Sequence, residues 1–160
     1  MQNSERQIAV INDILFIGDP LSKYDLYITD RRLIVIDSKN FYGGGGIGWV
    51  LIGSVLTDTL EQGDEATAKK QKEMKEKFES LSLDEKLNSF YKNFGINYEE
   101  VSQIILNDSH SRWRKATLKI ISERKHAKFQ PTKEQFEQLT VILPKIEALK
   151  EKLVTNKKEF

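Results

Sequence analysis

Cysteine is absent from this chain of 160 residues, and proline is rare, with three occurrences. Without cysteine there is no disulfide framework, no thiolate nucleophile and no cysteine-based zinc or iron–sulfur site. The sequence also lacks a run of about 20 apolar residues that would predict a membrane-spanning helix. Its formal net charge of +1 argues against a protein whose whole surface binds nucleic acid, because such a surface carries a strong positive excess.

Signals for export and for catalysis are missing as well. Residues 1–6 do not show the basic and then apolar profile of a signal peptide, so we expect a cytoplasmic protein. His110 and His126 have no partners at the spacing of a metal site or a catalytic triad. The adjacent carboxylates of Glu99 and Glu100 would diverge on a strand. We therefore predict a protein that is not an enzyme, with no catalytic residues, no cofactor and no metal site.

Short apolar stretches predict strands in the first part of the chain. Residues 7–17 predict a first strand that is bulged or turned at Asn12 and Asp13. A hairpin is predicted at residues 23–38, and its turn lies at Asp30 and Arg31.

The two strands of this hairpin differ in pattern. The alternation from Tyr24 to Thr29 is typical of a strand with one buried face. The continuous apolar run of residues 33–36 is typical of a strand covered on both faces. We expect Asp30 to hold the turn, because an aspartate side chain can accept a hydrogen bond from the backbone two residues further on.

The composition changes after the hairpin. Residues 41–56 hold six of the nine glycines and no charged residue, whereas residues 57–94 hold nine acids and seven lysines. Residues 66–78 are rich in helix-forming types but have few apolar residues on one face, so we expect a solvated or loosely attached helix. Ser82 is the expected cap of a further short helix.

Strand signals then resume. They begin at Ile96, continue to Leu106, and recur over residues 113–122 and 125–130. Ala116, Leu118 and Ile120 are expected to share one face of the middle strand.

A single helix is predicted at the end of the chain. Thr132 to Gln135 has the form of a capping box, in which two side chains bond to the amides of the first turn. Pro144 should kink or split this helix, because proline removes an amide and crowds the preceding turn. The apolar residues at helical spacing are Phe136, Leu139, Leu143, Ile146, Leu149 and Leu153.

Three motifs in this order resemble the PH-like superfamily, specifically the bacterial and archaeal PH domains and the GRAM domains. Residues 26–35 resemble the family hairpin, an apolar strand, a threonine, a basic turn and a second apolar strand. Residues 94–101 are similar to the family turn Ile-Pro-Tyr-x-Glu-Ile, with Asn97 in place of the proline and Val101 in place of the last isoleucine. The third motif is the single helix from Thr132 onward.

The resemblance covers residues 7–38 and 94–155. It implies a mainly β fold with α, a bent antiparallel barrel capped by a C-terminal helix, with a helical insertion after the third strand. We predict a single domain over residues 1–160, in which residues 39–94 are the insertion. Some relatives carry a glycine-rich apolar insertion after this hairpin, which residues 41–56 resemble.

The phosphoinositide site of the family does not carry over to this chain. Phosphoinositide-binding PH domains cluster lysine and arginine around their first hairpin loop. The corresponding loop here, residues 18–24, offers Lys23 together with Asp19. Fold alone therefore assigns no ligand.

The glycine-rich segment has two interpretations. It lacks the glycine patterns of nucleotide-binding loops. It could be a flexible linker whose tail, residues 47–56, packs on the barrel. It could instead contact a membrane or self-associate, since glycine allows close backbone approach and tryptophan suits the membrane interface. The candidate membrane or partner contacts are Ile47, Trp49, Val50, Leu51 and Ile52.

A basic stretch is the second candidate. Residues 109–128 contain seven basic residues against one acid, Glu123. Such a surface could contact anionic phospholipid headgroups or nucleic-acid phosphates, or it could be a solvated face balanced by the acids of residues 58–85. The candidate headgroup or anion contacts are Arg112, Arg114, Lys115, Lys119 and Lys125.

These observations favour a PH-like binding or adaptor module that contacts an anionic membrane surface or a protein through the insertion and the basic stretch. We expect a cytoplasmic protein, peripheral to the membrane, and do not expect nucleic acid as the partner. The alternative is a self-associating scaffold, a homo-oligomer paired through Phe136, Leu139, Leu143 and Ile146 of the terminal helix.

Overall fold

The computed structural model describes residues 4–18, 23–37, 64–109 and 114–157. The chain divides into two compact units. One consists of residues 1–35 and 95–160, and the other of residues 36–94. The single-domain organisation stays a prediction.

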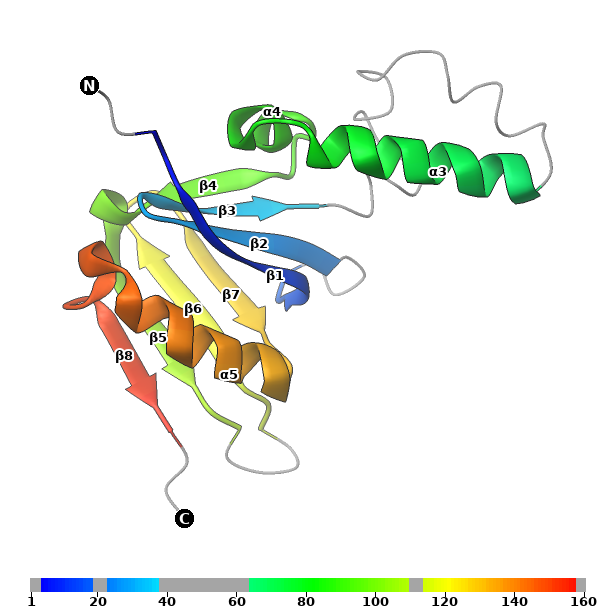
Figure 1. Cartoon of the computed structure of the whole chain (residues 1–160). Helices are drawn as coiled ribbons and strands as arrows, with labels where there is room; N and C mark the ends of the chain where they lie inside the picture. Colours follow the sequence, from blue (N-terminus) through cyan, green and yellow to red (C-terminus); the bar gives the residue numbers. More distant parts are fainter. Residues whose placement is uncertain (1–3, 19–22, 38–63, 110–113, 158–160) are drawn as a thin grey trace. The chain divides into compact units, whose positions relative to one another are not determined.

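The chain is mainly β with α, and its eight strands form one sheet (Figure 1). Their order in the sheet is β4-β3-β2-β1-β7-β6-β5-β8. The strands are β1 (Gln7–Phe16), β2 (Lys23–Thr29), β3 (Arg32–Ile36), β4 (Phe94–Asn97), β5 (Val101–Asn107), β6 (Thr117–Ser122), β7 (His126–Gln130) and β8 (Leu153–Asn156). The mainly β class with α, the two helices after the third strand and the C-terminal helix agree with the prediction, whereas the strands are not all antiparallel, because β8 runs parallel to β5.

The sheet is not closed into a barrel. β4 and β8 lie at the two ends of the strand order. β8 pairs with β5 in parallel, with Ile104 opposite Leu153 and Ile105 opposite Val154. The last strand thus covers the edge of β5 that β6 leaves free, which the sequence did not indicate.

The first strand joins the two halves of the sheet. β1 pairs with β2 from Gln7 to Leu15, and its last residues, Leu15 and Phe16, pair with β7. The register shifts between Ile11 and Ile14, and Asp13 has a φ of 55°. This confirms the bulge predicted at Asn12 and Asp13, because an extra residue in the left-handed region bends the bulged strand.

The second strand is more buried than its alternation predicted. Asp25, Tyr27 and Thr29 are all at most 9% exposed, so the expectation of one solvated face was wrong. The polar members are buried with hydrogen-bond partners: Asp25, for example, accepts a bond from the Asp13 amide at 3.0 Å. The run from Leu33 to Ile36 is buried throughout, as predicted.

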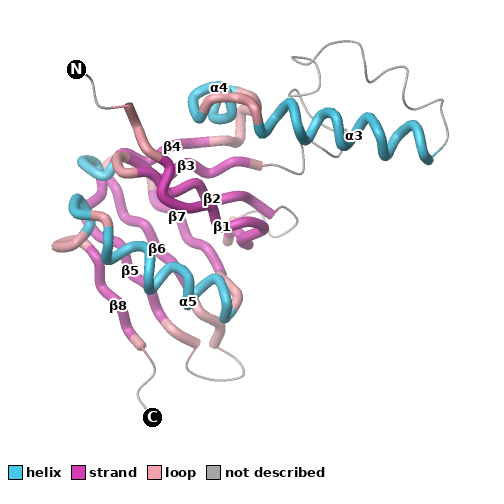
Figure 2. Tube along the Cα trace, viewed as in Figure 1, coloured by secondary structure: helices cyan, strands magenta, loops and turns pink. Residues whose placement is uncertain are grey.

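The terminal helix is shorter than its apolar spacing predicted. α5 (Lys133–Ile142), one of the helices coloured cyan in Figure 2, begins at the expected capping box of Thr132 and Gln135. It ends just before Pro144, whose ring cannot continue the helix. Two 3-10 turns follow, η3 (Leu143–Lys145) and η4 (Glu147–Leu149), and Leu153 opens β8 instead of ending a helix.

The apolar face proposed for self-association is used inside the chain. Phe136, Leu139, Leu143 and Ile146 are at most 6% exposed. On the polar side of α5, the Gln135 Nε2 donates to the Asn12 carbonyl of β1 at 2.7 Å. These four side chains are therefore not available to a second copy.

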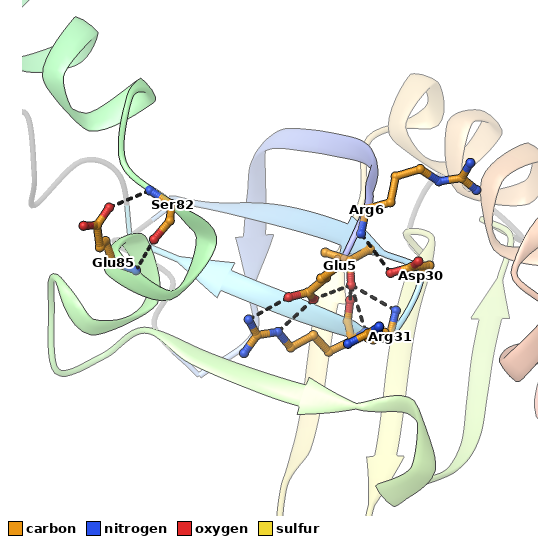
Figure 3. Close-up of polar contacts among 8 residues, drawn as sticks. Glu5, Arg6, Asp30, Arg31, Ser82 and Glu85 are labelled. Carbon is orange, nitrogen blue, oxygen red and sulfur yellow. Dashed lines mark hydrogen bonds and ion pairs between the residues drawn. The ribbon is translucent and has the colours of Figure 1, made fainter. Parts of the chain in front are cut away.

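The unit of residues 36–94 contains α3 (Asp64–Glu79) and α4 (Leu83–Asn88). Ser82 caps α4, as predicted, and it forms a capping box with Glu85 (Figure 3). The described side chains of α3 are exposed except Met74 and Phe78, one helical turn apart, so the helix has a short apolar contact near its end.

A single asparagine ties the two ends of this unit. The Asn93 Oδ1 accepts from the Asp37 amide at 2.7 Å, and its Nδ2 donates to the Lys86 carbonyl at 3.0 Å. Asn93 thus links the start of the unit to the end of α4.

The hairpin turn between β2 and β3 is held by Thr29. The Thr29 hydroxyl accepts from the amides of Arg31 at 3.1 Å and Arg32 at 3.0 Å, and it lies 2.7 Å from Oε1 of Glu5. Glu5 also receives two bonds from the Arg32 guanidinium, at 2.9 and 2.8 Å. The turn is where the sequence placed it, but the side chain that holds it is Thr29 rather than Asp30.

Asp30 instead forms hydrogen bonds with the backbone of Arg6, the residue just before β1. Its Oδ1 accepts from the Arg6 amide at 3.0 Å, and its own amide donates to the Arg6 carbonyl at the same distance. Figure 3 shows Glu5, Arg6, Asp30 and Arg31 gathered at this turn. We call Thr29, Glu5, Arg32 and Tyr98 the hairpin cluster.

Tyr98 joins the second family motif to the first. Its hydroxyl donates to the Thr29 carbonyl at 2.6 Å, and its amide donates to the Arg31 carbonyl at 3.0 Å. Burial, and then the negative charges of Asp30 and Glu5, raise the pKa of Tyr98 above its ordinary value. The two sequence motifs that resemble PH-like domains are therefore one packed cluster.

Replacing Thr29 by valine should destabilise the protein. Valine has a similar shape but accepts no hydrogen bond, so two turn amides lose their partner, at a cost of about 2 kcal/mol. Chemical denaturation measures this loss. The matched control is Val141→Thr, the reverse exchange at a residue of α5 that is 57% exposed, where a change within about 0.5 kcal/mol is expected. Equal effects of the two substitutions would contradict the role given to Thr29.

Tyr98 should make the protein sensitive to alkali. Since the folded chain holds the phenolic proton more tightly, the unfolded chain loses it first, and stability falls as the pH rises above about 10. The slope from one such group approaches about 1.4 kcal/mol per pH unit. Denaturation at a series of pH values should show a shallower fall for Tyr98→Phe. The matched control is Tyr91→Phe, which removes the same hydroxyl from a residue that is 71% exposed.

Candidate functional site

The predicted basic contacts lie before, within and after β6. Arg114 and Lys115 precede β6 and are exposed, Lys119 lies within it, and Lys125 follows it in the turn to β7. Arg112 lies outside the described residues. The candidate contacts of the glycine-rich segment also lie outside them, namely Ile47, Trp49, Val50, Leu51 and Ile52.

Alternation along β6 and β7 separates two faces of the sheet. Leu118, Ile120, Ala127 and Phe129 are buried and face the core. The residues between them face the opposite side and are more accessible. We call this side the basic face, and its members in the argument below are Ile105, Lys119, Ile121, His126, Lys128 and Val154.

A pair of lysines is the main feature of the basic face. Lys119 and Lys128 are direct cross-strand partners in the antiparallel pair of β6 and β7. Side chains opposite each other in this way start about 5 Å apart, and like charges there destabilise the sheet. In the part of the chain that the structure describes, neither ammonium forms an ion pair or a hydrogen bond. The fold thus places two positive charges together without neutralising them.

Apolar side chains extend the same row across the sheet. Lys119 is also opposite Ile105 of β5, and Ile105 is opposite Val154 of β8. Val154 is 37% exposed. In the next row, Ile121 is opposite His126. The basic face therefore combines cationic and apolar groups on one accessible surface.

Lys125 is not in phase with Lys119. Lys125 lies two residues before Ala127 and four before Phe129, so its position along the chain is in phase with these core-facing residues. It lies at the turn, where its amide donates to the Ser122 hydroxyl at 3.0 Å. Loss of hydration lowers the pKa of the Lys125 ammonium. The structure thus separates Lys125 from Lys119, although the sequence grouped them.

Arg124 is directed elsewhere as well. Its Nε lies 4.0 Å from Glu100, and its side chain is 84% exposed, so this ion pair is weak.

Lys128 was not among the residues selected from the sequence, although a signal for it existed. β6 and β7 are joined by Glu123, Arg124 and Lys125, and the Ser122 amide donates to the Lys125 carbonyl across this turn. A loop of known length fixes the register of a hairpin, so Lys119 must oppose Lys128. No sequence signal indicated that Ile105 and Val154 belong to the basic face, because their place beside the lysines depends on the order of the strands in the sheet.

Comparisons with known proteins do not identify a ligand for the basic face. No protein-family model and no curated protein sequence matches the chain. Among solved structures it is similar to the N-terminal PH domain of Vps36, with a TM-score of 0.48 and 10% identity over 94% of this chain and 83% of that one. It is also similar to the C-terminal domain of an unknown protein from Leishmania infantum, with a TM-score of 0.44 and 11% identity over 87% and 82%. Both TM-scores are below 0.5, so neither similarity supports a statement about the function of this chain.

Reversing one charge of the lysine pair should stabilise the protein. Lys128→Glu replaces repulsion by attraction to Lys119, a gain of about 0.5 to 1 kcal/mol at low salt. Denaturation of a double-mutant cycle measures the coupling. When Lys119 is first changed to glutamine, the same reversal should give no comparable gain. An equal gain in both backgrounds would show that the two side chains do not interact.

Proposed function

We propose that this chain is a non-enzymatic binding module of the PH-like class that makes peripheral contacts with anionic membrane surfaces through its basic face. The observation that supports it best is the cross-strand pair of Lys119 and Lys128, which the fold holds together without an acidic partner among the described residues. Like charges kept adjacent at a cost to stability suggest a ligand that supplies the negative charge. Among the described residues no group of three potential ligands could hold a metal ion.

The chemistry of the face suits a phospholipid surface. Each basic residue near an anionic membrane contributes about 1 kcal/mol to binding. Ile105, Ile121 and Val154 lie beside the lysines, where they could contact the apolar part of the interface. Within the described ranges, no helix is long and apolar enough to cross a membrane.

The glycine-rich segment is the second element of this proposal. It is uncharged and contains a tryptophan among aliphatic residues, a composition that suits shallow contact with the interface. The proposed contacts are Ile47, Trp49, Val50, Leu51 and Ile52. This part rests on the sequence alone, so deletion of residues 43–56 tests it separately from the basic face.

Substitution of the lysine pair tests the proposal. The double variant Lys119→Gln/Lys128→Gln should sediment with phosphatidylserine-containing vesicles about 30-fold more weakly, because two contributions of about 1 kcal/mol are lost. Since the substitutions also relieve repulsion, the variant should fold at least as stably as the wild type. The matched control is Lys133→Gln/Lys145→Gln, which removes the same charge at exposed positions outside the face and should bind nearly normally.

Further measurements identify the kind of partner. Binding should fall with added salt and disappear on vesicles of phosphatidylcholine alone. Equal losses in the two double variants would mean that only net charge matters, and absence of salt-sensitive binding to anionic vesicles would refute the proposal. Tighter binding to single-stranded nucleic acid or to an acidic protein than to vesicles would replace the membrane by that partner.

A further inference from the structure

The last strand leaves one edge of the sheet open. β8 (Leu153–Asn156) pairs with β5 on one side and is the final strand in the order, so no described residue pairs with its other side. Val154, Thr155 and Asn156 are exposed. Figure 1 shows β8 at this edge beside β5. The strand contains no proline, no glycine and no charged residue, which are the usual means of protecting an edge.

The direction of the free backbone groups follows from the bonds to β5. The carbonyl of Lys152 accepts from the Ile104 amide, and that of Asn156 accepts from the Asp108 amide, both at 2.9 Å. Backbone groups of alternate residues in a strand point to the same side. Lys152, Val154 and Asn156 therefore face β5, and the N–H and C=O groups of Leu153 and Thr155 point away from the sheet.

We propose that two copies of this chain associate by antiparallel pairing of β8 with β8 around a two-fold axis at Val154. This register places Leu153 of one copy opposite Thr155 of the other, and both residues present the outward N–H and C=O groups that a hydrogen-bonded pair exchanges. Val154 then faces Val154 of the second copy in a non-hydrogen-bonded pair, where side chains are closest. The strand is thus complementary to itself in backbone bonding and in side-chain chemistry.

Charges next to the strand favour the same register. Counting outward from Val154, the pairing brings Glu151 of one copy toward Lys157 of the other, and symmetry makes this contact twice. Both residues are exposed. An isologous contact of this kind closes after two copies, because each β8 has one free edge.

The pairing also continues an existing row of side chains. On the basic face, one row of neighbouring side chains crosses the sheet in the order Lys128, Lys119, Ile105 and Val154. Joining two copies at Val154 forms an apolar centre of four aliphatic residues with a lysine pair at each end. The exposed part of Val154 is then covered by its equivalent.

A proline substitution tests the pairing without disturbing the sheet of one copy. Thr155→Pro removes an amide that points outward, so the bonds to β5 remain, whereas the dimer loses two equivalent bonds. Sedimentation velocity over a wide range of protein concentration should show a concentration-dependent dimer for the wild type and for Thr155→Ala. Thr155→Pro should raise the dimer dissociation constant about tenfold or more. A wild type that stays monomeric, or a Thr155→Pro variant that dimerises as well as Thr155→Ala, would overturn the proposal.

A disulfide can locate the contact, because the chain has no other cysteine. In Val154→Cys the two Cα atoms of the pair would lie about 4.5 Å apart, within the range of a disulfide. Mild oxidation should link this variant rapidly. Val141→Cys, at a residue 57% exposed on α5, gives the rate of chance collisions. Equal rates for the two variants would contradict pairing at Val154.

Charge exchange tests the register. Glu151→Lys should weaken the dimer severalfold at low salt, and Glu151→Lys/Lys157→Glu should restore it, since the opposite charges meet again. A double variant as weak as the single one would reject this register. None of these readouts involves membranes, so failure of the dimer and failure of the proposed membrane contact are distinguishable.

Discussion

The rest of the sheet depends on the buried hydroxyl of Thr29. This one group accepts from two turn amides and contacts Glu5, while the carbonyl of the same residue receives the Tyr98 hydroxyl. Glu5 is in turn held by the Arg32 guanidinium. Residues far apart in the chain are thereby fixed at one end of the hairpin. An apolar core alone would not specify this register, since a sheet can slip without losing much buried area.

A second constraint acts at the other end of β2. The Asp13 bulge bends β1 so that its first part pairs with β2 and its last residues pair with β7. One strand therefore belongs to both halves of the sheet. The cost of an aspartate in the left-handed region is small, because this residue type tolerates that conformation better than most. The bend brings β7, and with it Lys128, into the same sheet as the hairpin cluster.

The basic face and the open edge follow from the same strands. β5 carries Ile105 on its accessible side and receives β8 at its edge, so the lysine pair and Val154 lie in one row. A two-fold axis at Val154 is perpendicular to the sheet, and it would place the basic faces of two copies on one side. Two linked faces bind a surface more strongly than one, because the second contact is intramolecular. The two proposals are thus compatible, although neither requires the other.

Local signals were sufficient for much of the fold. The turn after Thr29, the bulge at Asp13 and the caps at Ser82 and Thr132 each depend on a few neighbouring residues. For the same reason the sequence was enough to place α4 and the start of α5. Apolar spacing alone did not predict the structure after Pro144. A residue such as Leu149 can be buried from a 3-10 turn as well as from a helix, and half-buried Leu153 belongs to a strand.

The sequence by itself determined the number and type of most elements, the order that resembles PH-like domains, and the presence of a basic stretch. Only the tertiary structure decided which side chains share a surface. It separated Lys125 from Lys119, added Lys128, and placed Val154 at an open edge. The physical reason is that side-chain neighbours across a sheet are set by strand order and register. These depend on contacts such as those of Thr29 with Tyr98, between residues distant in the chain.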